Sequence, residues 1–263
     1  MRLHFYKYQA TGNDFVIIDN RQAGLTLTTD QIVRICDRRF GVGADGLMLL
    51  EPHPSEDFRL IYYNSDGSQS LCGNGSRAAV QLAAKLGMVK QHATFEAYDG
   101  LHEALIEPAL VRLKMNDVSD VRPVNDDWFV HTGSPHFIRF VPQVNSYPVV
   151  DEGRQIRYSE AFRPGGTNAN FVELRANNTI YVRTYERGVE AETLSCGTGV
   201  TAAALAASLK GYRSPVQIET KGGTLSVAFK TGHNGQPAAD APAFRDIFLI
   251  GPAKLVFEGD LEL

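Results

Sequence analysis

The sequence has few cysteines, no long apolar run and no excess of basic charge. Its 263 residues include three cysteines, which are too few for a disulfide scaffold and are compatible with a reducing compartment. No stretch approaches the roughly 18 consecutive apolar residues of a membrane-spanning helix, and the first residues lack the apolar run of a signal peptide. A formal net charge of −4 offers no basic surface for gripping phosphates. We therefore expect a soluble, cytoplasmic protein that binds neither nucleic acid nor membranes.

What the sequence does contain is the pattern of a globular protein with both strands and helices. Its composition, 43% hydrophobic and 21% charged, is typical of folded chains. Segments rich in β-branched and aromatic residues predict strands at 15–18, 47–50, 59–63, 111–115, 137–141, 171–174, 180–183 and 248–250. Helices are predicted at 29–38 and in two alanine-rich segments, which end near Gly87 and Gly211. The predicted fold class is α/β in the broad sense that includes α+β.

The two alanine-rich segments begin alike, with Cys-Gly-x-Gly at Cys72 and at Cys196. Other landmarks recur at offsets between 121 and 124, namely Gly12 with Gly133, 43–47 with 166–171, and 95–96 with 218–219. Unrelated helices can both be rich in alanine, because alanine is the best helix former. This explains why the later parts of the two segments are similar, but not why both begin with Cys-Gly-x-Gly. The sequence therefore predicts a duplication, with one half at residues 1–120 and the other at 121–250.

A cysteine at the start of a helix is placed for acid–base chemistry. It faces backbone N–H groups and the positive end of the helix dipole, which both favour the thiolate, and flanking glycines leave those N–H groups open to an anion. A thiolate on one face of a carbon and a thiol on the other can invert that carbon by proton transfer. We therefore expect Cys72 and Cys196 to face each other across a cleft between the halves, to titrate as a coupled pair, and to invert the α-carbon of an amino acid whose carboxylate lies on the N–H groups.

Other interpretations of these residues carry less support. A redox disulfide between Cys72 and Cys196 is possible, although no Cys-x-x-Cys motif accompanies it, and Cys36 is expected to be a buried apolar side chain. Residues 41–46 match G-x-G-x-x-G but follow a predicted helix and precede a strand, the reverse of a dinucleotide site. His131 and His136 lack further ligands at metal spacing. We expect neither a cofactor nor a metal.

At these residues the sequence resembles the diaminopimelate epimerase family, whose members interconvert LL- and meso-diaminopimelate without a cofactor in lysine and peptidoglycan biosynthesis. The resemblance covers essentially the whole chain. It lies in ordered segments at residues 11–15, 39–46, 63–68, 72–75, 135–136, 166–168, 185–188, 192–199 and 251–253. It implies two domains, each a curved sheet around a central helix, with the active site in the cleft between them, and usually a homodimer. The segment 251–263 is expected to return to the first domain.

The resemblance also assigns roles to individual residues. It implies that Cys72 and Cys196 are the acid/base pair and that His136 and Glu186 help to poise them. The implied substrate contacts are Asn13, Asn64 and Asn168 through their amides, Gly73, Asn74, Gly197 and Thr198 through backbone N–H groups, and Glu186 and Arg187 at the distal end.

Two departures from the family pattern concern recognition of the distal group. Ser134 replaces a common asparagine, and the segment from Glu186 to Cys196 is one residue longer than usual. The nearest rival function is a racemase of the same fold acting on proline, hydroxyproline or another amino acid. A rival of another class is a non-catalytic amino-acid-binding or thiol-redox protein. The three asparagines and the Glu186–Arg187 pair favour a substrate with a polar, charged far end.

Overall fold

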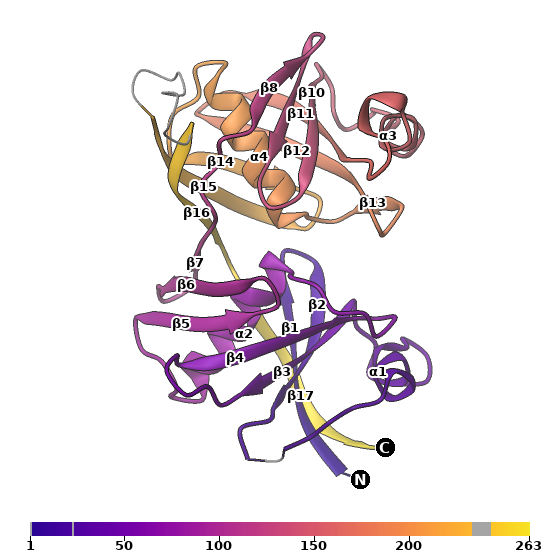
Figure 1. Ribbon diagram of the computed structural model, residues 1–263, viewed down its shortest axis with the longest axis vertical. Helices are drawn as coiled ribbons and strands as arrows, with labels where there is room; N and C mark the ends of the chain where they lie inside the picture. The colour runs from indigo at the N-terminus through magenta and orange to yellow at the C-terminus, as the bar shows by residue number, and fades with distance from the viewer. Residues whose placement is uncertain (1, 23, 233–242) are drawn as a thin grey trace. The chain divides into compact units, whose positions relative to one another are not determined.

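The computed structural model describes residues 2–22, 24–232 and 243–263, and the chain divides into two compact units (Figure 1). Unit 1 comprises Met1–Leu113 and Gly251–Leu263, and unit 2 comprises Lys114–Ile250. This division falls a few residues before the boundary that the sequence places between residues 120 and 121. In each unit, strands surround one alanine-rich helix.

Unit 1 begins with two strands that form a hairpin and ends with a strand that returns from the C-terminus. Its elements are β1 (Arg2–Ala10), β2 (Asn13–Asp19), α1 (Thr29–Cys36), β3 (Gly46–Glu51), β4 (Phe58–Asn64), α2 (Gly73–Lys85), β5 (His92–Ala97), β6 (Gly100–Ile106), β7 (Val111–Lys114) and β17 (Lys254–Glu262). The strands pair in the order β17–β1–β2–β3–β4–β5–β6–β7. The pairs β2–β3 and β4–β5 are parallel, and the others are antiparallel.

Unit 2 repeats this arrangement with one added strand. Its elements are β8 (Val121–Val124), β9 (Asp127–His131), β10 (Pro135–Phe140), α3 (Val149–Arg157), the 3-10 helix η1 (Glu160–Phe162), β11 (Asn168–Arg175), β12 (Thr179–Glu186), β13 (Ala191–Thr193), α4 (Gly197–Ser208), β14 (Val216–Thr220), β15 (Gly223–Thr231) and β16 (Phe244–Gly251). The pairing order is β8–β9–β10–β11–β12–β14–β15–β16, with β10–β11 and β12–β14 parallel. The short β13 pairs with β12 just before α4.

The register of the strands repeats as well as their order. Phe15 lies opposite Gly46 in the parallel pair β2–β3, and Phe137 lies opposite Ala169 in β10–β11. The two units are therefore built on one plan, which is the physical content of the repeat seen in the sequence. The predicted α+β fold class is confirmed.

Each central helix is buried by the strands of its own unit (Figure 1). Helix α2 contacts β1–β4, β6 and β17, and α4 contacts β9–β12, β14 and β15. A helix enclosed on all sides must be apolar or small on all sides, and ten of the twelve residues of α4 are buried. The alanines allow strands to approach closely on every side. The predicted ends are also observed, since Gly87 and Gly211 follow the two helices with φ of +72° and +95°.

The other face of each sheet is covered by a shorter helix, and this explains why some strands read as continuous apolar runs. Ile32 and Ile35 of α1 pack on β2 and β3, while Val149 and Ile156 of α3 pack on β10 and β11. Helix α1 ends at Cys36, two residues before the predicted end, because Asp37 is already extended, with ψ of 126°.

Helix α3 was not predicted from the sequence. It starts directly after Pro148, a position where proline is tolerated, and carries Gly153 in its middle, where glycine normally argues against a helix. The structure gives the reason for the glycine, since a Cβ at Gly153 would lie 2.3 Å from the Cβ of Tyr185 on β12. The close approach of α3 to β12 therefore requires a residue without a side chain.

This contact predicts that Gly153→Ala destabilises the protein although alanine is the better helix former. Overpacking costs about 1–3 kcal/mol, which exceeds the propensity gain of at most about 1 kcal/mol. We expect a lower midpoint in urea unfolding followed by circular dichroism. The matched control is Val150→Ala in the same helix, where the side chain is 42% exposed, and its midpoint should stay close to wild type. An unchanged midpoint for Gly153→Ala would contradict the proposed close packing.

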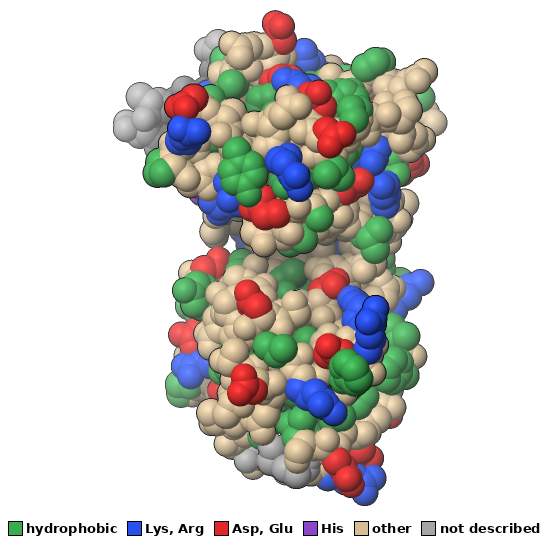
Figure 2. All heavy atoms as spheres, turned by 90° about the vertical axis from the view of Figure 1, so that its right-hand side faces the viewer, with side chains coloured by type: hydrophobic (Ala, Val, Ile, Leu, Met, Phe, Trp, Pro, Cys, Tyr) green, Lys and Arg blue, Asp and Glu red, His purple; other side chains and the backbone are tan. Residues whose placement is uncertain are grey.

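The surface agrees with the charge balance of the sequence. On the face in Figure 2, acidic and basic side chains are interspersed. Within the part of the chain that the structure describes, no helix is long and apolar enough to cross a membrane.

Candidate active site

In unit 1, Cys72 is the N-cap residue of α2. Its backbone is extended, with φ of −130° and ψ of 110°, and its carbonyl accepts the first helical hydrogen bond from the Ser76 N–H at 2.8 Å. The Gly75 N–H donates to the Cys72 sulfur at 3.5 Å. The sulfur thus takes the place of the hydroxyl or carboxylate oxygen that usually caps a helix, in contact with the positive end of the helix dipole.

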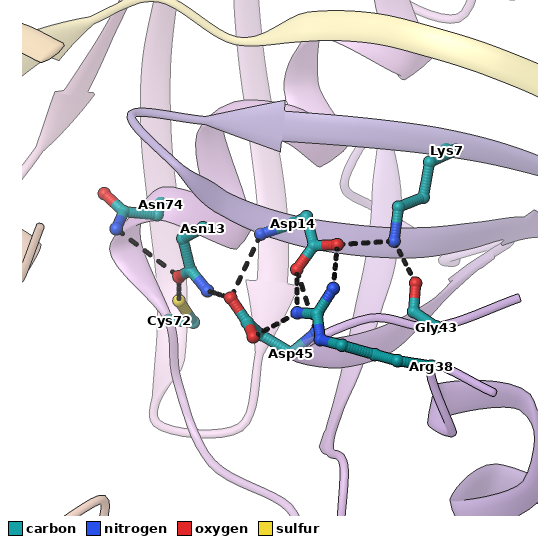
Figure 3. Close-up of polar contacts among 8 residues, drawn as sticks. All are labelled: Lys7, Asn13, Asp14, Arg38, Gly43, Asp45, Cys72 and Asn74. Atoms are coloured by element: carbon teal, nitrogen blue, oxygen red, sulfur yellow. Dashed lines mark hydrogen bonds and ion pairs between the residues drawn. The ribbon is translucent and has the colours of Figure 1, made fainter. Parts of the chain in front are cut away.

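The Asn13 side chain holds its carbonyl oxygen toward this sulfur (Figure 3). Its Oδ1 lies 3.4 Å from Cys72 Sγ and 3.4 Å from Asn74 Nδ2, and its Nδ2 donates to Asp45 Oδ2 at 2.6 Å. A carboxylate only accepts, so the amide nitrogen must face Asp45 and the oxygen must face the sulfur. The thiol of Cys72 therefore has an acceptor for its proton.

A cluster of charges behind Asn13 sets the position of Asp45 (Figure 3). Arg38 donates to both oxygens of Asp14, at 2.9 and 2.6 Å, and to Asp45 at 2.7 Å. The buried Lys7 donates to Asp14 at 2.7 Å and to the Gly43 carbonyl. Burial raises the pKa of Asp14, but the hydrogen bonds and charges of Arg38 and Lys7 outweigh it and bring the pKa down to about 2.

This cluster predicts that Asp14→Asn destabilises the fold at neutral pH. Because Lys7 is only 8% exposed, loss of its carboxylate leaves a poorly compensated charge, at a cost of about 2–3 kcal/mol. The lowered pKa means that the ionised carboxylate stabilises the native state above pH about 4, and this contribution is lost as the pH falls toward 2. The difference in unfolding free energy between wild type and variant should therefore shrink over that range.

The control for this prediction is Asp246→Asn. Asp246 also contacts two lysines, but its side chain is 43% exposed, so solvent screens the pairs and the expected change is small. Urea titrations at several pH values test both variants. A difference that stays constant between pH 4 and 2 would show that the ionisation of Asp14 does not act as described.

Asn74 and Arg77 complete the half-site of unit 1. The Arg77 guanidinium is fully buried and donates to Asn74 Oδ1 at 2.9 Å, which turns the Asn74 amide nitrogen toward Asn13. Burial lowers the pKa of Arg77 to about 10, and the electrostatic influence of the nearby Cys72 opposes that change. The sequence analysis did not identify Arg77 as a site residue. The only indication in the sequence was a single charged residue within an alanine-rich helix.

Asn64 lies at the end of β4, in a turn. Its amide nitrogen donates to the Ser68 carbonyl at 3.2 Å and the Ser68 hydroxyl at 3.0 Å, and its oxygen accepts from Ser70 at 3.3 Å. These local bonds keep the side chain at the loop before α2. The substrate role of Asn64 stays a prediction.

In unit 2, Cys196 is the N-cap residue of α4, at the position that Cys72 holds in unit 1. Its sulfur lies 3.6 Å from the Thr198 hydroxyl, and that hydroxyl lies 2.9 Å from Nε2 of His136 on β10. Thr132 donates to the Thr198 carbonyl at 3.0 Å and anchors the first turn. The cysteine, the threonine and the histidine that the sequence selected therefore form one connected group.

His136 is fully buried and neutral. Burial lowers its pKa to about 3, and the neighbouring His131 and Arg187 act in the same direction. Its Nδ1 lies 3.2 Å from the amide nitrogen of Asn170, a fully buried residue on β11 that the sequence analysis did not select. In sequence Asn170 is one more polar residue at the start of a strand, and only the pairing of β10 with β11 brings it to the histidine.

Asn168 and the loop after β12 form a second polar group in unit 2. The Asn168 amide nitrogen donates to the Ser134 hydroxyl at 3.0 Å and to the Pro135 carbonyl at 2.9 Å, and its oxygen accepts from the Arg187 N–H at 2.8 Å. The serine that departs from the family pattern is thus a direct partner of Asn168. Glu186 accepts from the Thr193 hydroxyl at 2.9 Å.

Comparison with known proteins identifies the family to which these half-sites belong. The family model for diaminopimelate epimerase matches residues 5–118 and again residues 128–241. The chain belongs to the diaminopimelate epimerase family. Both the family and the isomerase class predicted from the sequence are confirmed.

Relatives within the diaminopimelate epimerase family match this chain over nearly its whole length. The diaminopimelate epimerase of Flavobacterium psychrophilum is 46% identical, covering 97% of this chain and 99% of the relative. Those of Chlorobaculum tepidum and Aquifex aeolicus are 42% and 38% identical, covering 96% and 98% of this chain and 98% of each relative.

Solved structures from other families share the fold. A phenazine biosynthesis protein of the PhzF family from Bacillus anthracis is 16% identical with a TM-score of 0.75, covering all of both chains. A hydroxyproline epimerase from Agrobacterium vitis is 14% identical with a TM-score of 0.71, covering 100% of this chain and 93% of that one. At such identities the likeness concerns the fold alone.

Cys36 and the glycine-rich segment 41–46 do not form a further reactive thiol or a nucleotide site in this family member. Cys36 is 4% exposed in α1, and burial raises the pKa of its thiol to about 11. The N–H groups of Gly41 to Ala44 donate to the last carbonyls of α1 and the turn after it, so they are not available to a phosphate. No group of three metal-ligating side chains occurs among the residues that the structure covers.

Proposed function

We propose that this chain interconverts LL- and meso-diaminopimelate, with Cys72 and Cys196 as the acid/base pair and without a cofactor. The observation that carries the proposal is the repeated placement of a cysteine at the N-cap of each central helix. One fold plan used twice supplies two equivalent sulfurs, and inversion of a carbon needs two proton-transfer groups on opposite faces. Membership of the diaminopimelate epimerase family supports the choice of substrate.

The proposed reaction moves one proton off the α-carbon and another onto it. The thiolate removes the α-proton, and the electron pair of the broken C–H bond is delocalised into the α-carboxylate. The thiol then donates its proton to the opposite face of the same carbon. One thiol and one thiolate remain with their roles exchanged, so the reverse reaction uses them in the opposite order. The proposal requires both sulfurs to reach one α-carbon in the substrate complex.

The helix starts supply the electrostatic part of this reaction. The backbone N–H groups of Gly73 and Asn74 at α2, and of Gly197 and Thr198 at α4, are proposed to hold the α-carboxylate. Hydrogen-bond donors that are already oriented toward the developing charge stabilise it without reorganisation. The amides of Asn13, Asn64 and Asn168, with Glu186 and Arg187, are proposed to bind the amino groups and the distal carboxylate.

The distal group separates this substrate from those of the nearest rivals. Proline and hydroxyproline have no second amino-acid end, so they would leave a charged Arg187 and Glu186 without a partner on the substrate. Asn168 joins these residues to the rest of unit 2, since it accepts from the Arg187 N–H. These polar groups favour diaminopimelate over a cyclic imino acid.

We also propose that the enzyme is a cytoplasmic homodimer acting in lysine biosynthesis. A pair of catalytic thiols must stay reduced, which suits a reducing compartment. Light scattering of the purified enzyme tests the dimer directly, and a monomeric mass would refute it without affecting the proposed chemistry.

Hydrogen exchange at the α-carbon tests the proposed function. Incubated with LL-diaminopimelate in D₂O, the reduced enzyme should introduce deuterium at one α-carbon and form the meso isomer, as followed by NMR and chiral chromatography. The matched controls are L-proline and trans-4-hydroxy-L-proline under the same conditions. Exchange with neither stereoisomer of diaminopimelate would refute the epimerase, and exchange with a cyclic imino acid alone would identify the rival racemase.

A further inference from the structure

We propose that Asn170 and Thr198 are positioning residues that hold His136 as a neutral hydrogen-bond donor, so that the Thr198 hydroxyl donates to the Cys196 sulfur and stabilises its thiolate. The inference rests on the proposed function in one respect only, that Cys196 acts as a base. In this proposal His136 donates a hydrogen bond to the Thr198 hydroxyl and does not act as a base that deprotonates a thiol.

Two neighbours of Asn170 determine the orientation of its amide. One amide atom lies 3.0 Å from the Phe137 carbonyl oxygen, and the other accepts from the Thr184 hydroxyl at 2.9 Å. A backbone carbonyl only accepts, so the atom beside it must be the NH₂ group. The same NH₂ group therefore faces Nδ1 of His136, at 3.2 Å.

The orientation of the Asn170 amide determines which ring nitrogen of His136 carries the proton. An NH₂ group only donates, so Nδ1 must accept and carries no proton. Because the buried ring is neutral, its single proton is on Nε2. Nε2 lies 2.9 Å from the Thr198 hydroxyl oxygen, to which it therefore donates.

The hydroxyl of Thr198 can in turn donate a hydrogen bond to the sulfur of Cys196. We call this chain of hydrogen bonds, from Asn170 through His136 and Thr198 to Cys196, the relay. The hydroxyl oxygen accepts from His136, so the hydroxyl proton is available for another acceptor. In the described part of the chain, the remaining polar partner of this hydroxyl is Cys196 Sγ, at 3.6 Å. A hydrogen bond to the charged form of an acid favours that form, so this contact lowers the free energy of the thiolate.

The surrounding charges support a neutral histidine. The titratable groups that act on His136 are His131 on β9 and Arg187 after β12, and both oppose a positive charge on the ring. The first turn of α4 carries no acidic or basic side chain. A histidine in this environment is a poor base, since it would have to accept a proton into a buried site next to a cation.

The described residues of unit 1 place different side chains at the positions equivalent to this chain of hydrogen bonds. By strand register, Asp14 stands in unit 1 where His136 stands in unit 2, and Asp14 is bound to Arg38 and Lys7. The carbonyl oxygen of Asn13, an acceptor, lies at the Cys72 sulfur. The repeated backbone thus places a side-chain acceptor at one sulfur and a side-chain hydroxyl at the other, and Cys72 serves as an internal control.

Alkylation of the two cysteines in the substrate-free enzyme tests the contact between threonine and sulfur. Iodoacetamide labelling at pH 5–9, quantified for each cysteine by mass spectrometry, reports the thiolate fraction at each site. In Thr198→Val the apparent pKa of Cys196 should rise, and its labelling at neutral pH should slow about tenfold, while the profile of Cys72 is unchanged. Thr198→Ser keeps the hydroxyl and should restore the wild-type profile.

The ¹⁵N chemical shifts of His136 test the rest of the relay. The wild-type ring should show a protonated Nε2 and an unprotonated Nδ1 throughout the same pH range. In Asn170→Asp a carboxylate replaces the donor, so Nδ1 should become protonated, and circular dichroism reports whether that variant is folded. Should Asn170→Asp not fold, the wild-type shifts and the threonine pair still decide the matter.

Two results would overturn the relay. One is a wild-type His136 with its proton on Nδ1, and the other is a folded Thr198→Val whose Cys196 is alkylated at the wild-type rate at every pH. Neither measurement involves a substrate, so a failed relay is distinguishable from a failed epimerase, which is detected by deuterium exchange alone.

Discussion

Replacing Cys72 or Cys196 with alanine should reduce epimerisation by at least about a thousandfold, because each variant lacks the proton donor or acceptor on one face of the α-carbon. A correctly positioned acid or base contributes about 10²–10⁴-fold to a rate, and inversion needs both. Chiral chromatography of the products from LL-diaminopimelate measures the loss. Each variant should keep the wild-type circular dichroism spectrum, since loss of one N-cap side chain costs about 0.5–2 kcal/mol, a small part of the roughly 5–15 kcal/mol by which a native protein is stable.

Cys36→Ala is the matched control for these variants. Cys36 is also a cysteine in a helix, but its buried thiol, with a pKa raised to about 11, is protonated at neutral pH. We expect the rate of this variant to stay near wild type. Turnover near wild type in either Cys72→Ala or Cys196→Ala would rule out the two-thiol mechanism, whatever the behaviour of Cys36→Ala.

Gly199→Ala should reduce kcat/KM about a hundredfold, since the new methyl group would enter the relay behind Cys196. A Cβ at Gly199 would lie 2.5 Å from Asn170 Oδ1 and 3.3 Å from Cys196 Sγ. Either the amide or the sulfur must move, and a displacement of about 1 Å at reacting groups costs on the order of 10² in rate. Steady-state kinetics in the direction from LL- to meso-diaminopimelate provides the measurement.

The repeat offers a matched control at the same helix position of unit 1. In Gly75→Ala the new Cβ would lie 3.3 Å from Met48 Sδ and 3.4 Å from Cys72 Cβ. Methionine is flexible and adapts to small changes in volume, so we expect a loss of less than about tenfold. Equal losses in the two variants would show that the crowding at Asn170 is not what makes Gly199 sensitive.

The sequence predicted the features of this chain that depend on local pattern and on repetition. The Cys-Gly-x-Gly beginnings placed Cys72 and Cys196 at helix starts because an N-cap residue and its helix are adjacent in the chain. The apolar run at residues 47–50 marked a strand that is buried on both faces. The recurrence of the Cys-Gly-x-Gly beginnings and of other landmarks at nearly constant spacing revealed the duplication, since a repeated fold keeps its landmarks in order.

Helix α3 and the partners of the site residues were missed for a physical reason. Gly153 looks like a helix breaker until Tyr185 is placed against it, and Tyr185 is far along the chain. Asn170 and Arg77 look like ordinary polar residues until strand pairing and burial show what they contact. Each of these signals depends on a neighbour that is distant in sequence.

The amino-acid sequence by itself determined the fold class, the duplication and the positions of the two helix-start cysteines, because these follow from periodicity, composition and spacing along the chain. Only the tertiary structure decided that the carbonyl oxygen of Asn13 faces Cys72 and that a hydroxyl faces Cys196. A hydrogen bond has a direction that depends on every further partner of the donor and the acceptor. Asp45, just before β3, and Asn170 on β11 provide those partners, so the different surroundings of the two cysteines exist only in the folded chain.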